Sequence, residues 1–255
     1  LPAMDIIMNT LERAGYPLRD YQMSGVKWMR QHEANGNGGI LADDPGLGKT
    51  IQALALAVPE ESHPTLIVVP KSVVNQWLEL AEIIFGKDLV YVFQGSNKKQ
   101  DLGEYRIVIT TYTTLILNGG TSDPALLWLS CLKNSGSIGS QESIKAYQSW
   151  SKQPKALRNI WEKRARKTVS PLRKTHWTRV ILDEAHHIKN NKTMTYKSVC
   201  MIESQFRLCL TGTPMENHLG ELKNIFDFLV PGYLGSNEFF QQEFLAPITQ
   251  EHSLE

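Results

Sequence analysis

The chain has 255 residues, of which 42% are hydrophobic and 21% are charged, and its formal net charge is +1. This balance excludes a disordered chain, a collagen, a long coiled coil and a disulfide-rich scaffold. The three cysteines have no metal-binding spacing, and no apolar run reaches the roughly 20 residues of a membrane helix. We therefore expect a soluble, intracellular globular protein with no membrane partner.

Short apolar runs alternate with helical patterns along most of the chain. The runs are continuous rather than alternating in polarity, as buried parallel strands are, and they lie at 39–42, 65–69, 89–93, 107–110, 180–182 and 206–210. Helical patterns cover 50–58, 73–84, 193–202 and 219–229. Strands that alternate with helices predict an α/β fold, with an open, mostly parallel sheet and helices on both faces.

A basic segment interrupts this rhythm at about 118–175. Between Lys145 and Arg179 there are eleven Lys and Arg residues and one acid, Glu162, so this stretch carries +10 while the rest of the chain carries −9. We interpret the segment as a partly helical insertion. Its charge is typical either of a solvated helical face or of an arm that binds phosphates, and a protein-docking role is also open.

A glycine-rich loop follows the first predicted strand and leads into a helix, which is the setting of a phosphate-binding loop. Its backbone N–H groups and the start of the helix would face phosphate oxygens. Lys49 would reach the β- and γ-phosphates, and the Thr50 hydroxyl would face Mg²⁺. Asp43 stands where the pattern has its first glycine, and a simple glycine-rich helix start is the alternative. The predicted nucleotide-binding residues are Asp44, Pro45, Gly46, Leu47, Gly48, Lys49 and Thr50.

Two carboxylates follow the predicted strand at 180–182. Asp183 would hold Mg²⁺, directly or through water, and Glu184 would act as general base toward the attacking water. His186 would link this site to a neighbouring motif. A helix cap or a solvated turn is the alternative interpretation of the pair on its own.

Two further segments fit the same chemistry. The amide of Gln22 can pair with the N6 and N7 edge of adenine, although a solvent-facing glutamine early in a helix is the alternative. The segment Thr211, Gly212 and Thr213 follows the last predicted strand. It would couple the acidic loop, which is Asp183–His186, to the rest of the protein. An ordinary turn is the alternative there.

With these residues in view, the sequence resembles the first RecA-like lobe of the Swi/Snf-related superfamily-two DNA translocases, which are helicase-like ATPases. The resemblance extends from about residue 15 to 232, except for the insertion, and the run 181–190 is similar to the helicase-like transcription factor and repair translocase subgroup. The motifs that carry it are Tyr21–Trp28, Ala42–Thr50, Val69–Ser72 with Trp77, Thr110–Tyr112, Asp183–His186 and Leu210–Asn217.

The resemblance implies ATP and Mg²⁺ as cofactors, double-stranded DNA in chromatin as partner, and a nuclear location. It implies a helicase ATP-binding domain over 1–235 and a tail over 236–255. The second RecA-like lobe, with its arginine finger, is not found after Leu229, so we expect slow hydrolysis by this chain alone, as a monomer. The residues implied to contact DNA phosphates without reading bases are Lys71, Ser72, Val73, Thr110, Thr111 and Tyr112.

Two other functions stay open at this point. An RNA helicase of the same superfamily would share the nucleotide chemistry, although the Asp-Glu-Ala-Asp type usually has Ser-Ala-Thr where this chain has Thr211–Thr213. An inactive scaffold, gated by nucleotide and binding protein partners, would not need the intact Lys49, Asp183 and Glu184.

Overall fold

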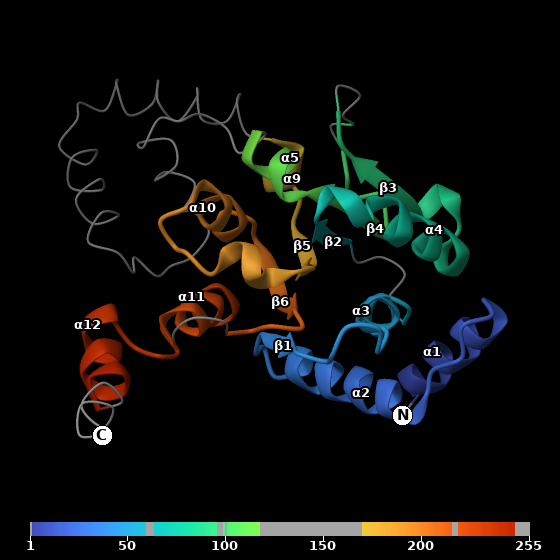
Figure 1. Ribbon diagram of the computed structural model, residues 1–255. Helices are drawn as coiled ribbons and strands as arrows, with labels where there is room; N and C mark the ends of the chain where they lie inside the picture. The colour runs from blue at the N-terminus through green and yellow to red at the C-terminus, as the bar shows by residue number, and fades with distance from the viewer. Residues whose placement is uncertain are drawn as a thin grey trace.

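The computed structural model describes residues 2–59, 64–95, 99, 101–117, 170–215 and 219–247. Within them, six strands form one sheet in the order β1-β6-β5-β2-β4-β3, and every neighbouring pair is parallel (Figure 1). The strands are β1 (Gly39–Leu41), β2 (Thr65–Val69), β3 (Val90–Phe93), β4 (Ile107–Thr111), β5 (Trp177–Leu182) and β6 (Ser204–Leu210). The predicted open parallel α/β fold is therefore confirmed.

Helices connect the strands and precede the sheet. The α-helices are α1 (Pro2–Arg13), α2 (Asp20–Ala34), α3 (Lys49–Leu56), α4 (Val74–Phe85), α5 (Tyr112–Leu117), α9 (Pro171–Lys174), α10 (Met194–Cys200), α11 (Leu219–Leu229) and α12 (Asn237–Phe240). Short 3-10 turns are η1 (Lys71–Val73), η2 (Lys87–Leu89) and η3 (Ala185–Ile188), and η4 (Gln241–Leu245) is a π-helical turn. No described helix is long and apolar enough to cross a membrane.

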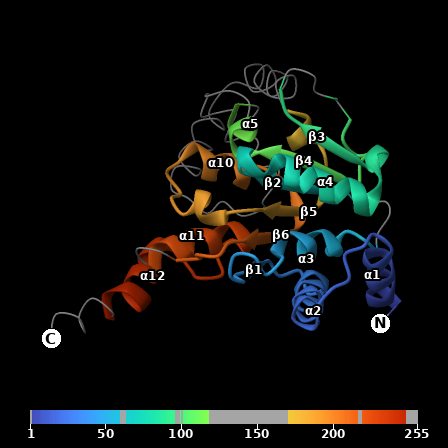
Figure 2. The same ribbon diagram turned by 45° about the vertical axis from the view of Figure 1, so that its right-hand side comes forward.

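The side chains of the sheet divide between two hydrophobic cores. Because neighbouring residues of a strand point to opposite faces, Ile67 packs with helices α1 to α4, whereas Leu66 and Val68 pack with α10 and α11. The same alternation holds in β6, where Leu208 and Cys209 belong to different cores. Both faces are thus covered by helices, which explains why the strands are apolar throughout (Figure 2).

The predicted strands and helices are all present, and the structure adds helices α1, α2, α5, α9 and α12 and the first residues of β5 and β6. Strand β5 begins at Trp177, three residues before the predicted start, because the Trp177 side chain is buried and its indole donates to the carbonyl of Leu172 (2.7 Å). Helices α1 and α2 precede the predicted elements. Helix α1 is held by Ile7 and Leu11, which are buried in the core.

Most of the predicted insertion, 118–169, lies outside the described residues. Its last part is folded: the Ser170 hydroxyl accepts from the backbone N–H of Leu172, which is buried. Arg179 was counted in the basic stretch but does not belong to an arm. It is 2% exposed in β5, and its guanidinium contacts both carboxylate oxygens of Glu33, at 2.6 and 3.1 Å.

The carboxyl ends of the parallel strands meet at one edge of the sheet. Strand β1 leads there to the glycine-rich loop, β5 to Asp183 and β6 to Thr211, while β2 leads to η1 and β4 to Tyr112. In open α/β sheets ligands bind at this edge. All the motifs singled out from the sequence, apart from Gln22, therefore follow the same edge.

Candidate nucleotide-binding site

The loop between β1 and α3 has the backbone of a phosphate cradle. Gly46 and Gly48 have φ angles of +88° and +79°, which only glycine adopts at little cost. Helix α3 begins at Lys49, directly after this turn, with Thr50 as its second residue. A Cβ added to Gly46 would meet nothing within 4 Å, so the loop is open on that side. The turn and the helix start together point backbone N–H groups toward one place.

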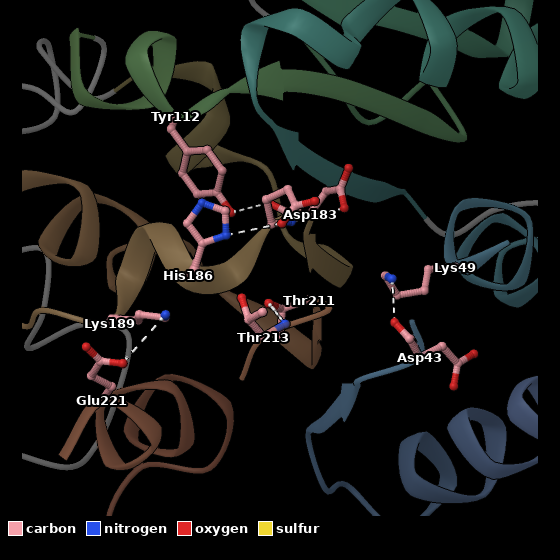
Figure 3. A network of polar contacts seen from close by, with 10 residues as sticks. Asp43, Lys49, Tyr112, Asp183, His186, Lys189, Thr211, Thr213 and Glu221 are labelled. Atoms are coloured by element: carbon pink, nitrogen blue, oxygen red, sulfur yellow. Dashed lines mark hydrogen bonds and ion pairs between the residues drawn. The ribbon is translucent and has the colours of Figure 1, made fainter. Parts of the chain in front are cut away.

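Lys49 is folded back onto its own loop. Its ammonium donates to the backbone carbonyls of Asp43, at 2.6 Å, and Asp44, at 3.3 Å (Figure 3). The Asp43 carboxylate, which stands in place of a glycine, accepts from the side-chain amide of Gln52 on α3 (2.9 Å). Asp43 therefore fastens the start of the loop to the helix that follows it, a role that the sequence did not reveal.

Gln22 lies against the same loop. Its side chain is buried, its amide nitrogen donates to the carbonyl of Leu47 (3.1 Å), and its amide oxygen accepts from the N–H of Arg19 (2.9 Å). A Cβ on Gly48 would come within 2.4 Å of the Gln22 amide nitrogen, so the contact requires glycine there. Each end of the amide keeps capacity for one more hydrogen bond. Adenine pairing by Gln22 stays a prediction, but the solvent-facing alternative is wrong.

Asp183 forms hydrogen bonds through both oxygens of its carboxylate and through its main-chain N–H and carbonyl. Its Oδ2 accepts from the indole Nε1 of Trp77 (2.8 Å), and its Oδ1 accepts from the N–H of Glu184 (3.0 Å). Its own N–H donates to the carbonyl of Val68 (2.9 Å), and its carbonyl accepts from the hydroxyl of Tyr112 (2.7 Å). Asp183 is therefore held at its carboxylate by Trp77 and its own loop, and at its main chain by Val68 and Tyr112.

Glu184 has the only positive φ angle among the non-glycine residues described, +51°. Such a conformation costs on the order of 1–2 kcal/mol and persists where the surroundings impose it. Its carboxylate lies 3.1 Å from Nδ1 of His186, and both side chains are partly exposed. A partly exposed carboxylate with an imidazole beside it suits a general base.

Burial and nearby charges set the electrostatics of the acidic loop. Burial raises the pKa of Asp183, and the Trp77 hydrogen bond and the Lys49 ammonium oppose this rise. Lys49 and Asp183 are more than a hundred residues apart in sequence, and the Lys49 charge still favours the ionised form of Asp183. Burial also raises the pKa of Tyr112 well above its ordinary value, so its hydroxyl stays a donor.

The segment after β6 contacts the phosphate loop. The N–H of Thr211 donates to the carbonyl of Leu41 at the end of β1 (3.2 Å), and the Thr211 hydroxyl accepts from the N–H of Thr213 (3.1 Å). A Cβ on Gly212 would lie 3.2 and 3.3 Å from the ring carbons of Pro45. These contacts provide a direct structural connection between the predicted coupling segment and the nucleotide loop.

The residues predicted to contact DNA fall into two groups. Lys71 and Ser72 are exposed in η1, with Val73 half-buried beside them. In contrast, Thr110 and Thr111 are buried. The Thr110 hydroxyl donates to the carbonyl of Phe93 (2.9 Å), and that of Thr111 donates to Thr114 (2.8 Å).

The Tyr112 side chain is buried as well. The side chains of this second group are thus internal, and their contact with phosphates stays a prediction that concerns their backbone.

An ion pair attaches the segment after the acidic loop to helix α11. Lys189 follows η3, and its ammonium lies 3.6 Å from the carboxylate of Glu221 on α11 (Figure 3). The amide of Asn224 donates to the carbonyl of Lys189 (2.6 Å). Sequence reasoning gave Lys189 and Asn224 no role. Glu221 lies just after the motif Leu210–Asn217 and extends the family resemblance. The signal that could have found these residues is the presence of charged residues within the otherwise apolar pattern of helix α11.

The donor set fits a magnesium nucleotide. Mg²⁺ prefers carboxylate and hydroxyl oxygens, which Asp183 and Thr50 provide, and it retains several waters, one of which Glu184 could reach. The described residues contain no group of three side chains suited to hold a metal by themselves. With one or two protein ligands, Mg²⁺ is usually bound together with substrate phosphates.

Comparison with known proteins agrees with this geometry. The SNF2-related domain family matches residues 21–255. An uncharacterized ATP-dependent helicase of Schizosaccharomyces pombe is 34% identical over 245 residues, which are 91% of this chain and 21% of that protein. The human SWI/SNF-related matrix-associated actin-dependent regulator of chromatin subfamily A member 1 is 29% identical over 243 residues, 90% of this chain and 18% of that protein.

A solved structure is similar over the same region. The Sulfolobus solfataricus SWI2/SNF2 ATPase core in complex with dsDNA has a TM-score of 0.66 and 31% sequence identity, and the match covers 91% of this chain and 40% of that one. The chain thus spans about a fifth of the length of the two relatives above. The fold, the edge motifs and the family match together show that the chain belongs to the SNF2-related domain family, as a first RecA-like lobe of the SWI/SNF type.

Proposed function

We propose that this chain is the ATP-binding lobe of a double-stranded-DNA translocase, which couples ATP hydrolysis to chromatin remodelling or DNA repair in the nucleus. The observation that carries the proposal is that the glycine-rich loop with Lys49 and the carboxylates Asp183 and Glu184 follow strands at the same edge of one parallel sheet. The helicase ATP-binding domain would span 1–235, with the basic insertion within it. A second lobe of the parent protein would complete the site.

The roles of the residues follow from their contacts. Mg²⁺·ATP, when bound, supplies the phosphoanhydride bond and a cation that neutralises its charge. The Lys49 ammonium, which now donates to the carbonyls of Asp43 and Asp44, would donate to phosphate oxygens instead. Nucleotide binding would thus release the Lys49 side chain from the loop. Thr50 and Asp183 would hold the cation.

Glu184 would accept the proton of the attacking water. His186, 3.1 Å away, would orient the Glu184 carboxylate.

Nucleotide binding by the purified chain tests the proposal. We expect saturable binding of ADP that is tighter with Mg²⁺ and is lost in Lys49→Ala, measured by calorimetry. Lys87→Ala removes an exposed lysine outside the site and is the matched control. Binding that survives in Lys49→Ala, or fails in the wild type, would contradict the proposed site and favour the scaffold alternative.

The nucleic-acid partner needs a separate test on the two-lobed parent. We expect duplex DNA to stimulate its ATPase activity more than RNA of the same length, and the 255-residue chain alone to hydrolyse ATP slowly. Stronger stimulation by RNA would favour an RNA helicase, and rapid hydrolysis by the chain alone would overturn the need for a second lobe.

A further inference from the structure

Asp183 is held by side chains from two segments that follow neighbouring strands. Trp77 lies in α4, directly after η1 at the end of β2, and Tyr112 is the first residue after β4. Strands β2 and β4 pair in register, and β5, which leads to Asp183, pairs with the other side of β2. Side chains separated by 106 and 71 residues in sequence thereby converge on one aspartate.

Trp77 can act on Asp183 only as a donor of one hydrogen bond. Its side chain is 1% exposed, and an indole carries a single N–H. The bond to Oδ2 is 2.8 Å long, in the range of charge-assisted hydrogen bonds. A buried N–H without its acceptor would be costly, so the indole and the carboxylate fix each other's rotamers.

Tyr112 completes the hold from the opposite side. Its side chain is 6% exposed, and its hydroxyl donates to the main-chain carbonyl of Asp183 (2.7 Å). The ring also packs against His187, with ring centroids 4.7 Å apart and the ring planes tilted by 42°. Tyr112 therefore fixes the backbone of the acidic loop, whereas Trp77 fixes the carboxylate itself.

We propose that Trp77 and Tyr112 are positioning residues, which hold the Asp183 carboxylate in the orientation that receives the magnesium nucleotide. This inference rests on the proposed function. Each Asp183 oxygen already accepts one hydrogen bond and keeps a lone pair for the cation or its water. Groups of this kind behind a metal ligand typically contribute 10–100-fold to metal affinity.

Substitution of Trp77 by Phe removes the donor and keeps a large aromatic ring. The measurement is the affinity of the purified chain for ADP across a Mg²⁺ titration. We expect Trp77→Phe to weaken the Mg²⁺ dependence by about tenfold or more, while ADP affinity without Mg²⁺ stays within about twofold. Tyr112→Phe acts through the backbone, and we expect a smaller loss of the same kind.

Trp177→Phe is the matched control. Trp177 is also 1% exposed, and its indole also donates one hydrogen bond, to the carbonyl of Leu172 (2.7 Å). It lies at the opposite end of β5 from Asp183, roughly 20 Å away for six residues of strand. A merely structural loss of a buried indole would affect both variants alike, whereas the proposal requires the Mg²⁺ effect in Trp77→Phe alone.

The outcomes separate this inference from the proposed function. If wild-type protein shows no Mg²⁺-dependent ADP binding, the proposed function fails and the inference fails with it. If the wild type binds normally and Trp77→Phe keeps its full Mg²⁺ dependence, the inference alone is overturned.

A measurement on the wild-type chain covers the case in which Trp77→Phe does not fold. The indole N–H signal that shifts in an Asp183→Asn variant is that of Trp77. Mn²⁺·ADP should broaden this signal strongly and leave the Trp177 signal sharp. Equal broadening of the two signals, or none, contradicts the proposal.

Discussion

Gly212 faces the ring of Pro45, and a side chain there would be crowded by the ring unless the loop shifted by a few tenths of an ångström. A Cβ at Gly212 would lie 3.2 and 3.3 Å from two ring carbons, and a proline ring cannot rotate away. We therefore expect Gly212→Ala to displace the phosphate loop and weaken ADP binding several-fold. Calorimetry checks this, and the double variant Pro45→Ala/Gly212→Ala, which removes the ring, should recover much of the loss. If the double variant binds as weakly as Gly212→Ala, the contact does not transmit the effect.

His187 gives the acidic loop a pH-dependent stability. Burial lowers the pKa of His187, and the adjacent His186 acts in the same direction. The imidazole of His187 therefore binds a proton more readily in the unfolded chain than in the folded protein. As the pH falls below about 6.5, protonation favours the unfolded chain and the free energy of unfolding decreases. We expect the unfolding free energy of the wild type, relative to His187→Phe, to decrease between pH 7.5 and 5.5 in urea titrations. Phenylalanine keeps an aromatic ring against Tyr112, and parallel pH curves would contradict this prediction.

Sequence motifs identified the candidate nucleotide-binding and catalytic residues, but not the contacts that position these residues. Asp183 and Glu184 directly follow a strand, and Lys49 and Thr50 begin the helix after the glycine-rich loop that follows another, so their place at the sheet edge could be predicted from the order of elements. The Trp77–Asp183 contact spans 106 residues, and its formation depends on the strand order, which one sequence does not contain. The packing of Gln22 against the phosphate loop was missed for the same reason.

At the scale of elements, the Arg179–Glu33 pair joins strand β5 to helix α2. Both groups are largely removed from water, and the guanidinium contacts both carboxylate oxygens. Removal of one partner leaves the other charge without its counter-ion, which typically costs about 3–5 kcal/mol. We expect Arg179→Met to lower the unfolding free energy by about 3 kcal/mol in urea titrations followed by tryptophan fluorescence.

The pair His176–Glu203 provides the control for that experiment. His176 is 91% exposed, so the loss of this contact in Glu203→Gln should cost at most about 1 kcal/mol. Equal losses in the two variants would mean that the buried pair has no special role in attaching α2 to the sheet.

The strands were predictable because both faces of the sheet are covered, so each strand is a continuous apolar run. The extension of β5 to Trp177 was not, since Thr178 and Arg179 interrupt its apolar pattern. Arg179 lies buried in the strand with its guanidinium against the carboxylate of Glu33. A buried charge of this kind can be recognised only once its partner is known.

At the scale of the whole molecule, the charge of the chain is divided between two parts. Of the eleven bases counted from Lys145 to Arg179, Arg173, Lys174 and Arg179 lie in described residues, and the other eight lie within 143–169. Leu172, which follows this range, is 1% exposed and packs in the core. A deletion of 143–169 would therefore remove eight bases and Glu162 while keeping the helix α9 that the core requires.

This deletion tests whether the basic segment binds DNA phosphates. Each phosphate contact contributes about 0.9 to the slope of log affinity against log salt concentration for duplex DNA. If the segment neutralises two or more phosphates, the deletion should lower that slope by roughly 2 or more, measured by fluorescence anisotropy with a labelled duplex in KCl. A variant of full length, with the eight bases changed to Gln, should lower it equally, because charge and not length carries the effect. An unchanged slope in both variants would exclude the arm that binds phosphates and leave a solvated helical face or a protein-docking role, since the net charge of the segment would then contribute nothing to DNA affinity.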